Sequence, residues 1–138
     1  MVFNKFYIKF PIYIIIFLFV CITRLIKPFI IIRFFLIDGS RIGCFANNTE
    51  IYLCKKDEEN LNKKNKFYDL IYISQEICNL QLFKMYKRKL KIYNGFILWH
   101  IQKINRLIYG WQVHDLNYII ESEYDVDNLF SKYKNHIS

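Results

Sequence analysis

The chain contains few residues that interrupt regular structure, with only 4 glycines and 2 prolines among 138 residues. Together with a hydrophobic fraction of 54%, this scarcity excludes a disordered or low-complexity protein and predicts long regular elements. Cysteines are also few, and none of them form a C-x-x-C pair. Their spacing indicates neither a zinc site nor a disulfide framework, so we expect unpaired thiols in a reducing compartment at Cys21, Cys44, Cys54 and Cys78.

Acidic residues are outnumbered, with 12 Asp and Glu against 20 Lys and Arg and a net charge of +8. The basic surplus lies in residues 1–110, whereas residues 111–138 are acidic. A basic body favours an anionic partner such as phospholipid or a nucleotide-sugar, although codon usage rich in A and T explains the same composition. Nucleic acid is not an expected partner because no aromatic–basic recognition motif is present. No metal is expected either, since the spacing of His100, His114 and His136 fits no metal site.

The longest uncharged stretch, residues 10–23, lies near the N-terminus. Its extension to Phe6–Ile26 reaches the ~17–20 residues that a membrane-spanning helix needs, with Lys9 and Arg24 near its ends. A cleaved signal peptide is disfavoured because no small residues follow the apolar run. We therefore expect residues 1–27 to form a hydrophobic anchor, either a single spanning helix or a shallow interfacial helix. A buried core helix is the remaining alternative. The flanking charges favour the cytoplasmic face of the inner membrane for the rest of the chain.

Pro28 separates this anchor from a second apolar run, Phe29–Ile37. Its aromatic and β-branched residues are typical of a strand buried on both faces of a parallel sheet, although Arg33 in its middle does not fit that pattern. Asp38-Gly39-Ser40 is a turn signal, and Ser40 is a suitable N-cap. The apolar residues after it recur at helical spacing, so the sequence predicts strand, turn and helix over residues 29–54.

The remaining chain repeats this alternation. We expect an exposed loop over Lys55–Lys66, a strand over Phe67–Ser74 and a helix from Ser74 to Lys91. A further helix is predicted over Phe96–Tyr109 and one more within Asp115–Ser138. The alternation indicates an open α/β domain over residues 28–138, and two strands make only the beginning of a sheet of ordinary size.

The turn at residues 38–43 is the best candidate site that the residues themselves offer. Ligands gather at the carboxyl ends of strands in α/β folds, and a helix N-terminus presents free N–H groups to anions. Gly39 and Gly43 would let a ligand approach closely, and Arg41 could pair with a phosphate. A tight turn with a solvated arginine is the alternative.

Residues 41–53, RIGCFANNTEIYL, resemble the signature R-I-G-H-x-x-x-N-T-E-L-Y-L of a family of bacterial glycosyltransferases linked to surface polysaccharide synthesis. Residues 79–90 and 104–108 are similar to the family in the same order, so the resemblance covers roughly Lys27 to His114. It implies an incomplete Rossmann-like fold, namely the N-terminal half of a two-domain glycosyltransferase. The donor-binding half would be missing, because the family's chains run to several hundred residues.

The resemblance implies transfer of a sugar from a nucleotide-sugar, which is a co-substrate and not a bound cofactor, to a cell-surface glycan or a lipid-linked acceptor. The chain would be inactive alone and would need a separately encoded C-terminal half. Cys44 stands where the family has His, and a neutral thiol is a poor general base, so no catalytic residue is assigned. The residues expected to line an acceptor or phosphate cleft are Gly39, Arg41, Gly43, Asn48, Thr49 and Glu50.

A basic cluster on the helix predicted from Ser74 is a second candidate surface. Anionic lipid beside the anchor would attract it, although a solvated helix face is an equal alternative. Its members are Lys84, Lys87, Arg88 and Lys91. The alternative to a glycosyltransferase is a small non-enzymatic basic membrane protein that binds lipid or a protein partner.

Overall fold

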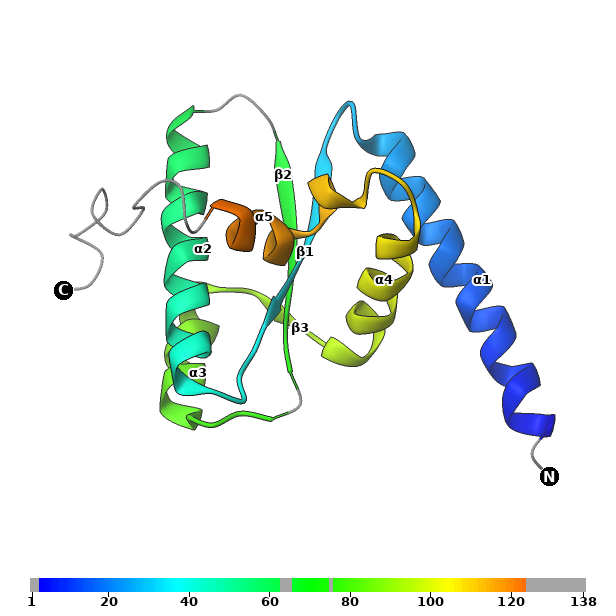
Figure 1. The fold of residues 1–138 in the computed structure, drawn as a ribbon, viewed down its shortest axis with the longest axis horizontal. Helices are drawn as coiled ribbons and strands as arrows, with labels where there is room; N and C mark the ends of the chain where they lie inside the picture. Colours follow the sequence, from blue (N-terminus) through cyan, green and yellow to red (C-terminus); the bar gives the residue numbers. More distant parts are fainter. Residues whose placement is uncertain (1–2, 63–65, 75, 124–138) are drawn as a thin grey trace.

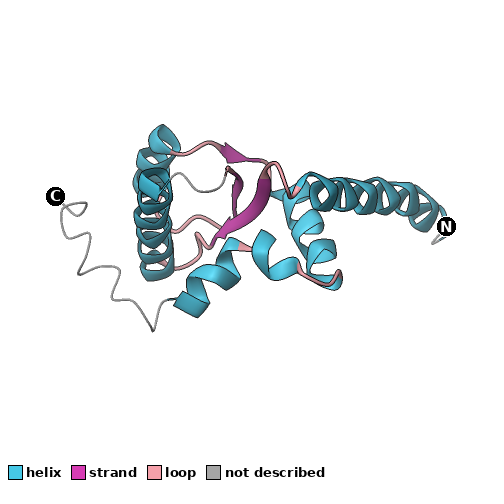
Figure 2. Ribbon diagram, turned by 90° about the horizontal axis from the view of Figure 1, so that it is seen from above, coloured by secondary structure: helices cyan, strands magenta, loops and turns pink. Residues whose placement is uncertain are grey.

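The computed structural model describes residues 3–62, 66–74 and 76–123, which form a mixed α/β structure with a three-stranded parallel sheet between two layers of helices (Figure 1). Helices α2 and α3 cover one face of the sheet, and α1 and α4 cover the other (Figure 2). The elements are α1 (Phe3–Ile26), β1 (Ile31–Ile37), α2 (Ile42–Asn62), β2 (Phe67–Ile73), α3 (Leu80–Lys89), β3 (Ile92–Tyr93), α4 (Gly95–Leu107), the 3-10 helix η1 (Trp111–His114) and α5 (Leu116–Glu123).

The strands lie in the order β1-β2-β3, and all of them are parallel. Ile31 to Ile37 pair in continuous register with Phe67 to Ile73. Side chains alternate between the two faces, so Phe35 packs toward α2 and α3, whereas its neighbour Phe34 packs toward α1 and α4. Both phenylalanines are fully buried. This confirms the prediction of an apolar strand covered on both faces.

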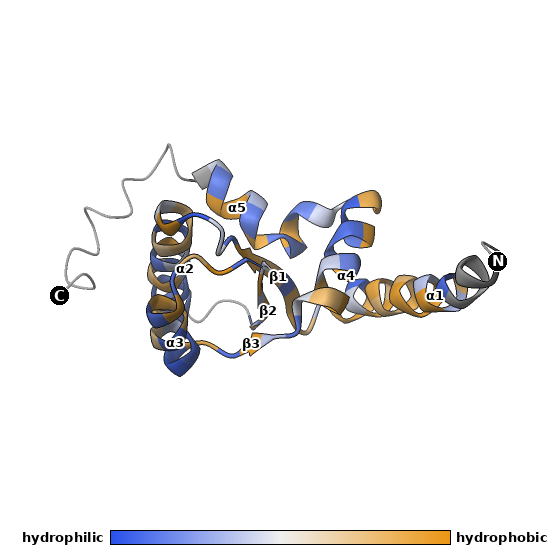
Figure 3. Ribbon diagram, turned by 90° about the horizontal axis from the view of Figure 1, so that it is seen from below, coloured by the Kyte–Doolittle hydropathy of each residue, from blue (hydrophilic) through white to orange (hydrophobic). Residues whose placement is uncertain are grey.

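Helix α1 is the N-terminal apolar helix that the sequence predicts, and it ends just before Pro28. Its window Lys9–Ile26 is long and apolar enough to cross a membrane (Figure 3). Only 17% of that window is buried. The buried stripe consists of Ile16, Val20 and Thr23, which lie at helical spacing on the side that faces α4. Most of the other side chains between Phe10 and Leu25 are apolar and exposed.

The exposed loop expected over Lys55–Lys66 is wrong, because α2 continues to Asn62. The polar residues of this last part of α2 lie on a helix with one side against the sheet, where Glu59 bonds to Arg33. Residues 63–65 lie outside the described part of the chain.

The predicted start of the next helix at Ser74 is also wrong, since α3 begins at Leu80 with Asn79 as its N-cap. Asn79 Oδ1 accepts a hydrogen bond from Leu82 N at 3.0 Å. The short strand β3 was not expected. The helix predicted within Asp115–Ser138 is present as α5 up to Glu123, and residues 124–138 lie outside the described residues.

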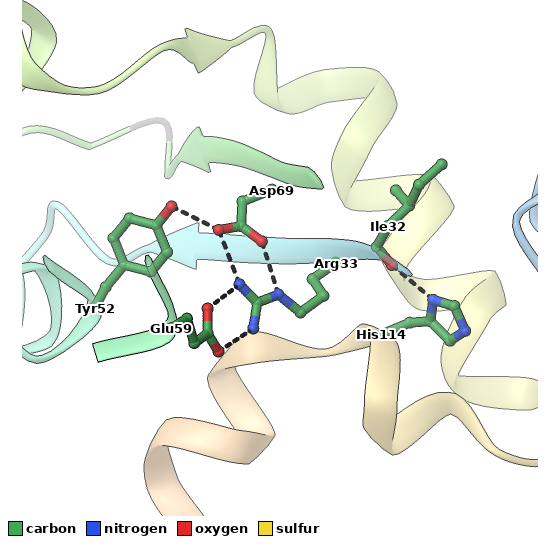
Figure 4. A network of polar contacts seen from close by, with 6 residues as sticks. All are labelled: Ile32, Arg33, Tyr52, Glu59, Asp69 and His114. Atoms are coloured by element: carbon green, nitrogen blue, oxygen red, sulfur yellow. Dashed lines mark hydrogen bonds and ion pairs between the residues drawn. The ribbon is translucent and has the colours of Figure 1, made fainter. Parts of the chain in front are cut away.

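Arg33 lies on β1 and is held by two carboxylates (Figure 4). Its Nε donates to Asp69 Oδ1 at 2.7 Å, and its two terminal nitrogens donate to the Glu59 oxygens at 2.6 and 2.7 Å. Its side chain is only 3% exposed. Burial by itself would lower the pKa of Arg33, but its hydrogen bonds to Glu59 and Asp69 and the charges of these carboxylates outweigh burial and raise that pKa. Arg33 therefore stays charged inside the protein.

Tyr52 completes the network by donating from its hydroxyl to Asp69 Oδ2 at 2.8 Å. Burial, followed by the charge of Asp69, raises the pKa of Tyr52, so its phenol keeps the proton that it donates. The Tyr52 ring also stacks on Phe35, with 4.8 Å between ring centroids. Helix α2 is thus attached to β1 and β2 by both polar and aromatic contacts.

The outer edge of β1 is covered by the segment around η1 and α5. Asp115 forms an isolated parallel bridge with Phe34. The side-chain amide of Asn117 then accepts from Leu36 N at 2.8 Å and donates to Leu36 O at 2.7 Å. An amide side chain thus takes the place of a neighbouring strand and satisfies the edge.

Replacing Arg33 by Leu should destabilise the protein by about 3–5 kcal/mol, because the two carboxylates would remain beneath the surface without their cation. The triple variant Arg33→Leu/Asp69→Asn/Glu59→Gln should be more stable than the single variant. Unfolding in urea measures both. The control Lys89→Gln changes an exposed residue and should shift stability by less than about 0.5 kcal/mol. A single variant no less stable than this control would contradict the assigned role.

The surroundings of His114 lead us to expect that the protein loses stability in mild acid. Its Nδ1 lies 2.6 Å from the Ile32 carbonyl oxygen, which can only accept, and its Nε2 has no partner in the described structure. Burial first, and then the charges of Arg24 and Lys27, lower the pKa of His114. Because the folded-state pKa lies below the unfolded value of about 6.5, the stability that His114 contributes is fully present above that pH. It is lost as the pH falls from there through the folded-state pKa.

The measurement is the melting temperature at pH 8 and at pH 5.5, for the native chain and for His114→Asn. The native chain should lose more stability between these two pH values than the variant, which has no titrating ring. Equal losses in the two proteins would show that His114 does not set the acid sensitivity.

Candidate functional site

A cavity of about 810 Å³ lies at the carboxyl ends of the three strands, which is where α/β proteins bind their ligands. The strand ends and the loops after them form its floor, and the first turns of α4 form one wall. The residues that line it are Leu36, Asp38, Ser40, Tyr72, Ile73, Ser74, Glu76, Ile77, Asn94, Gly95, Phe96, Trp99 and His100.

The loops after β1 and β2 hold each other in place at this edge. Gly39 N donates to Ser74 Oγ at 2.8 Å, and Cys78 N donates to Gly39 O at 2.8 Å. A Cβ atom at position 39 would lie 2.6 Å from the backbone oxygen of Glu76. The space that glycine leaves at this position is therefore occupied by the protein's own backbone, and the two loops can meet only because residue 39 has no side chain.

Two carboxylates give the cavity its charge. Asp38 accepts bonds from Ser40 Oγ at 2.6 Å and from Ser40 N at 3.0 Å. These bonds, with a smaller contribution from the nearby charge of Arg41, lower the pKa of Asp38 and keep it ionised. Glu76 is exposed on the loop after β2. Among the described residues that line the cavity there is no Lys or Arg, so the lining itself offers a phosphate no opposite charge.

The wall formed by α4 is aromatic. Phe96 and Trp99 line the cavity and are 69% and 44% exposed, which leaves much of each side chain open to a ligand. The His100 ring meets the rings of Phe96, Trp99 and Tyr13 edge to face, with centroids 5.2, 4.9 and 5.8 Å away. Tyr13 belongs to α1, so the apolar helix touches a residue of the cavity wall.

This lining matches a neutral, hydroxylated ligand. Carboxylates and an imidazole bond to hydroxyl groups, and exposed aromatic faces pack against the C–H faces of a sugar ring. Tyr72 in the floor cannot act as a base, because burial and then the charge of Asp115 raise its pKa. Its hydroxyl donates to Gln102, whose amide lies 3.4 Å from Asn117 Oδ1. A polar chain therefore connects the cavity floor to the covered edge of β1.

The structure separates the residues that the sequence predicts for the cleft. Gly39 lies in the loop next to the cavity lining, and the exposed Arg41 is close enough to affect Asp38. The other predicted residues lie on α2 and do not line the cavity. Gly43 is exposed, Asn48 is half-buried, Thr49 is buried and donates to Phe45 O, and Glu50 accepts from the Tyr86 hydroxyl at 3.1 Å.

The predicted basic cluster is divided between a helix and a loop. Lys84, Lys87 and Arg88 are exposed on α3, whereas Lys91 follows the end of that helix. Helix α3 lies on the opposite side of the sheet from α1 (Figures 1 and 2). The cluster is therefore not beside the apolar helix, and a single flat membrane cannot contact both surfaces.

Sequence reasoning missed Glu76, Asn94, Trp99 and His100. Glu76 follows the strand predicted from Phe67, as Asp38 follows the first strand, so the rule that selected the first turn would have found Glu76 if applied there. Asn94 follows β3, which the sequence did not predict. Trp99 and His100 give no local signal, because only the packing of α4 brings them to the strand ends. Among the residues that the structure describes, no cluster of His, Cys, Asp or Glu is suited to a metal. His136 lies outside these residues.

No protein family, curated protein or solved structure matches this chain. The grounds for assigning a function are therefore the cavity, its chemistry and the apolar helix beside it.

Replacement by alanine should have opposite effects on stability at positions 39 and 43, because the space for a Cβ atom differs. Gly39→Ala should cost about 1–3 kcal/mol, because its Cβ would displace the Glu76 backbone. Gly43→Ala should be neutral or stabilise by about 0.5 kcal/mol, since a Cβ there meets nothing within 4 Å and alanine favours the helix. Urea unfolding of both variants checks this pair. Similar stabilities for the two variants would contradict the packing of Gly39 against the second loop.

Proposed function

We propose that this chain is the acceptor-binding part of a membrane-associated glycosyltransferase, in which the cavity holds a neutral sugar of a glycolipid or lipid-linked glycan. The observation that carries the proposal is the position of the cavity. It lies at the carboxyl edge of a parallel sheet, and its aromatic wall on α4 packs against the apolar helix α1. An acceptor with a lipid tail would thus find its sugar site beside the element that enters the membrane.

The topology supports the same proposal. Three parallel strands in consecutive order, connected by α2 and α3 on one face of the sheet, are the arrangement of one βαβαβ half of a Rossmann-like domain. The segment 41–53 that resembles glycosyltransferases begins directly after the cavity loop of β1. The donor nucleotide-sugar would be bound by a second half outside the described residues, which agrees with a cavity lining that has two carboxylates and no described cation.

The chemistry would be the attack of an acceptor hydroxyl on the anomeric carbon of the nucleotide-sugar. A bond forms between the acceptor oxygen and that carbon, and the bond from that carbon to the phosphate oxygen breaks. The nucleoside diphosphate leaves with the electron pair, and the hydroxyl proton passes to a base. Glu76 or His100, both in the cavity lining, would accept this proton. Asp38, which is held ionised by Ser40, would orient a second hydroxyl.

Binding of a glycolipid tests the proposal without the second half. With Trp111→Phe as background, Trp99 is the remaining tryptophan and reports on the cavity. In lipid nanodiscs, a monoglucosyl diacylglycerol should change its fluorescence, and diacylglycerol without the sugar should not. Phe96→Ala should weaken this binding by about 3- to 10-fold, because one stacking surface is lost.

Phe29→Ala is the matched control, because Phe29 is 81% exposed but does not line the cavity. It should leave glycolipid binding unchanged. Uridine diphosphate should bind more weakly than the glycolipid, since Asp38 and Glu76 repel phosphate. Tighter binding of the nucleotide would contradict an acceptor site. Membrane attachment without any response to the glycolipid would favour a non-enzymatic membrane protein.

A further inference from the structure

Helix α1 does not stand free of the domain, and this limits how it can meet a membrane. From Tyr13 onward it lies beside α4, through the ring contact with His100 and the buried Ile16, Val20 and Thr23. Near its end, the Arg24 guanidinium donates to Gly110 O and, at 2.8 Å, to Asn105 Oδ1. The part before Tyr13, Phe3–Ile12, extends away from the domain in Figure 1 and is about 15 Å long at 1.5 Å per residue. A bilayer core is about 30 Å thick, so this part covers about half of it.

A crossing orientation would take α4 into the hydrocarbon along with α1. Lys103 and Arg106 are exposed on α4, and Arg106 Nε pairs with the buried Asp115 at 2.6 Å. Charged side chains at the bilayer centre are strongly unfavourable. Asp115 also bridges to β1, so the sheet edge would have to follow. The packing of α1 on α4 and a fully crossing α1 are therefore incompatible.

The exposed surface of α1 fits a different orientation. The side opposite the buried stripe carries Ile14, Leu18 and Leu25, which are 48%, 55% and 77% exposed. Figure 3 shows this apolar helix extending from one side of the domain. Phe96 and Ile97 at the start of α4 are exposed apolar side chains as well, and Phe96 meets His100, which contacts Tyr13 of α1. A helix that is apolar on its outer side and covered by protein on the other can lie in the plane of one leaflet.

The charges at the ends of this surface indicate the lipid. Lys9 precedes most of the exposed apolar residues and Lys27 follows α1, and both are exposed. Lysines at such positions extend to the headgroups while their stems remain in the apolar layer. On α4, Lys103 Nζ lies 4.3 Å from the centroid of the Trp99 ring. Tryptophan beside lysine is typical of the headgroup level, and the three cations favour anionic phospholipid.

We infer that α1 lies in the plane of one leaflet of an anionic phospholipid bilayer, with α4 at headgroup level, and does not cross the membrane. This inference rests on the membrane association in the proposed function and specifies its geometry. The wall of the cavity that carries Trp99 and His100 then lies next to the headgroups of the same leaflet. The basic residues of α3, on the far side of the sheet, face away from this membrane.

The depth of Leu18 tests the inference, because Leu18 lies at the middle of the apolar window Lys9–Ile26. In the full chain with Trp99→Phe and Trp111→Phe, the change Leu18→Trp places one tryptophan there. Vesicles of phosphatidylglycerol and phosphatidylcholine are then prepared with bromine at different positions along the acyl chains. The in-plane helix predicts strongest quenching by bromines near the headgroup end. Strongest quenching by bromines at the chain ends, near the bilayer centre, would overturn it.

Labelling from one side provides a second measurement that does not depend on tryptophan. Asn4→Cys places a thiol near the start of α1, and the native Cys78 is exposed on the domain as an internal control. The chain is added to preformed vesicles and treated with a maleimide that cannot cross lipid. Both thiols should react without detergent. Reaction of Cys78 alone, with position 4 labelled only after lysis, would show that α1 crosses.

The dependence of membrane partition on Lys103 distinguishes this inference from the proposed function. Lys103→Gln should weaken partition into the anionic vesicles about fivefold, and Lys89→Gln on the far side should not change it. Equal effects of the two variants would contradict the assigned surface. No partition of the native chain would overturn membrane association itself, and the proposed function with it. If the chain partitions into vesicles but the tryptophan of Leu18→Trp lies near the bilayer centre, only the in-plane geometry is overturned.

Discussion

The ion pairs of Arg33 are the interaction on which the α/β core depends. A guanidinium inside a parallel sheet is tolerated only if its charge and its N–H donors are satisfied. Asp69 satisfies it from the paired position on β2, and Glu59 satisfies it from the last part of α2. The Asp69 contact joins paired positions of β1 and β2, and the Glu59 contact holds the last part of α2 against the sheet. Arg33 is therefore not a candidate for binding an anion, since Asp69 and Glu59 already bond to its Nε and to both of its terminal nitrogens.

The two faces of the sheet pack against different helices, because successive side chains of each strand point to opposite faces. One side forms the core with α2, α3 and α5 around Phe35. The other side packs α4 and α1 around Phe34 and Tyr72, and this side contains the wall of the cavity. Tyr72 connects the cavity floor through Gln102 to the edge of β1. The proposed functions of the two surfaces are therefore linked by packing, since a movement of α4 would change both the sugar site and the helix that meets lipid.

The sequence predicted the elements whose signals are local and missed those that depend on partners. The strand at Phe29–Ile37 and the strand from Phe67 were found because continuous apolar runs of that length have few alternatives. The loop expected over Lys55–Lys66 was wrong, because a charged helix segment held by Arg33 has the composition of a loop. Ser74 looked like a helix cap, but its hydroxyl accepts from Gly39 and donates to Glu76 O, and Asn79 caps α3 instead. The resemblance to glycosyltransferases stays a prediction.

By itself the sequence determined an apolar N-terminal helix, alternating strands and helices, and a turn at Asp38–Ser40 directly after the first strand. These follow from periodicity and turn chemistry, which act over a few residues. Only the tertiary structure decided that Arg33 is neutralised, that Glu76, Trp99 and His100 join Asp38, and that α1 packs on α4. Such contacts join residues far apart in the chain, and their free energy comes from burial and pairing that no local pattern contains. The in-plane position inferred for α1 has the same origin, since its packing on α4, and not its length, limits how it can enter a bilayer.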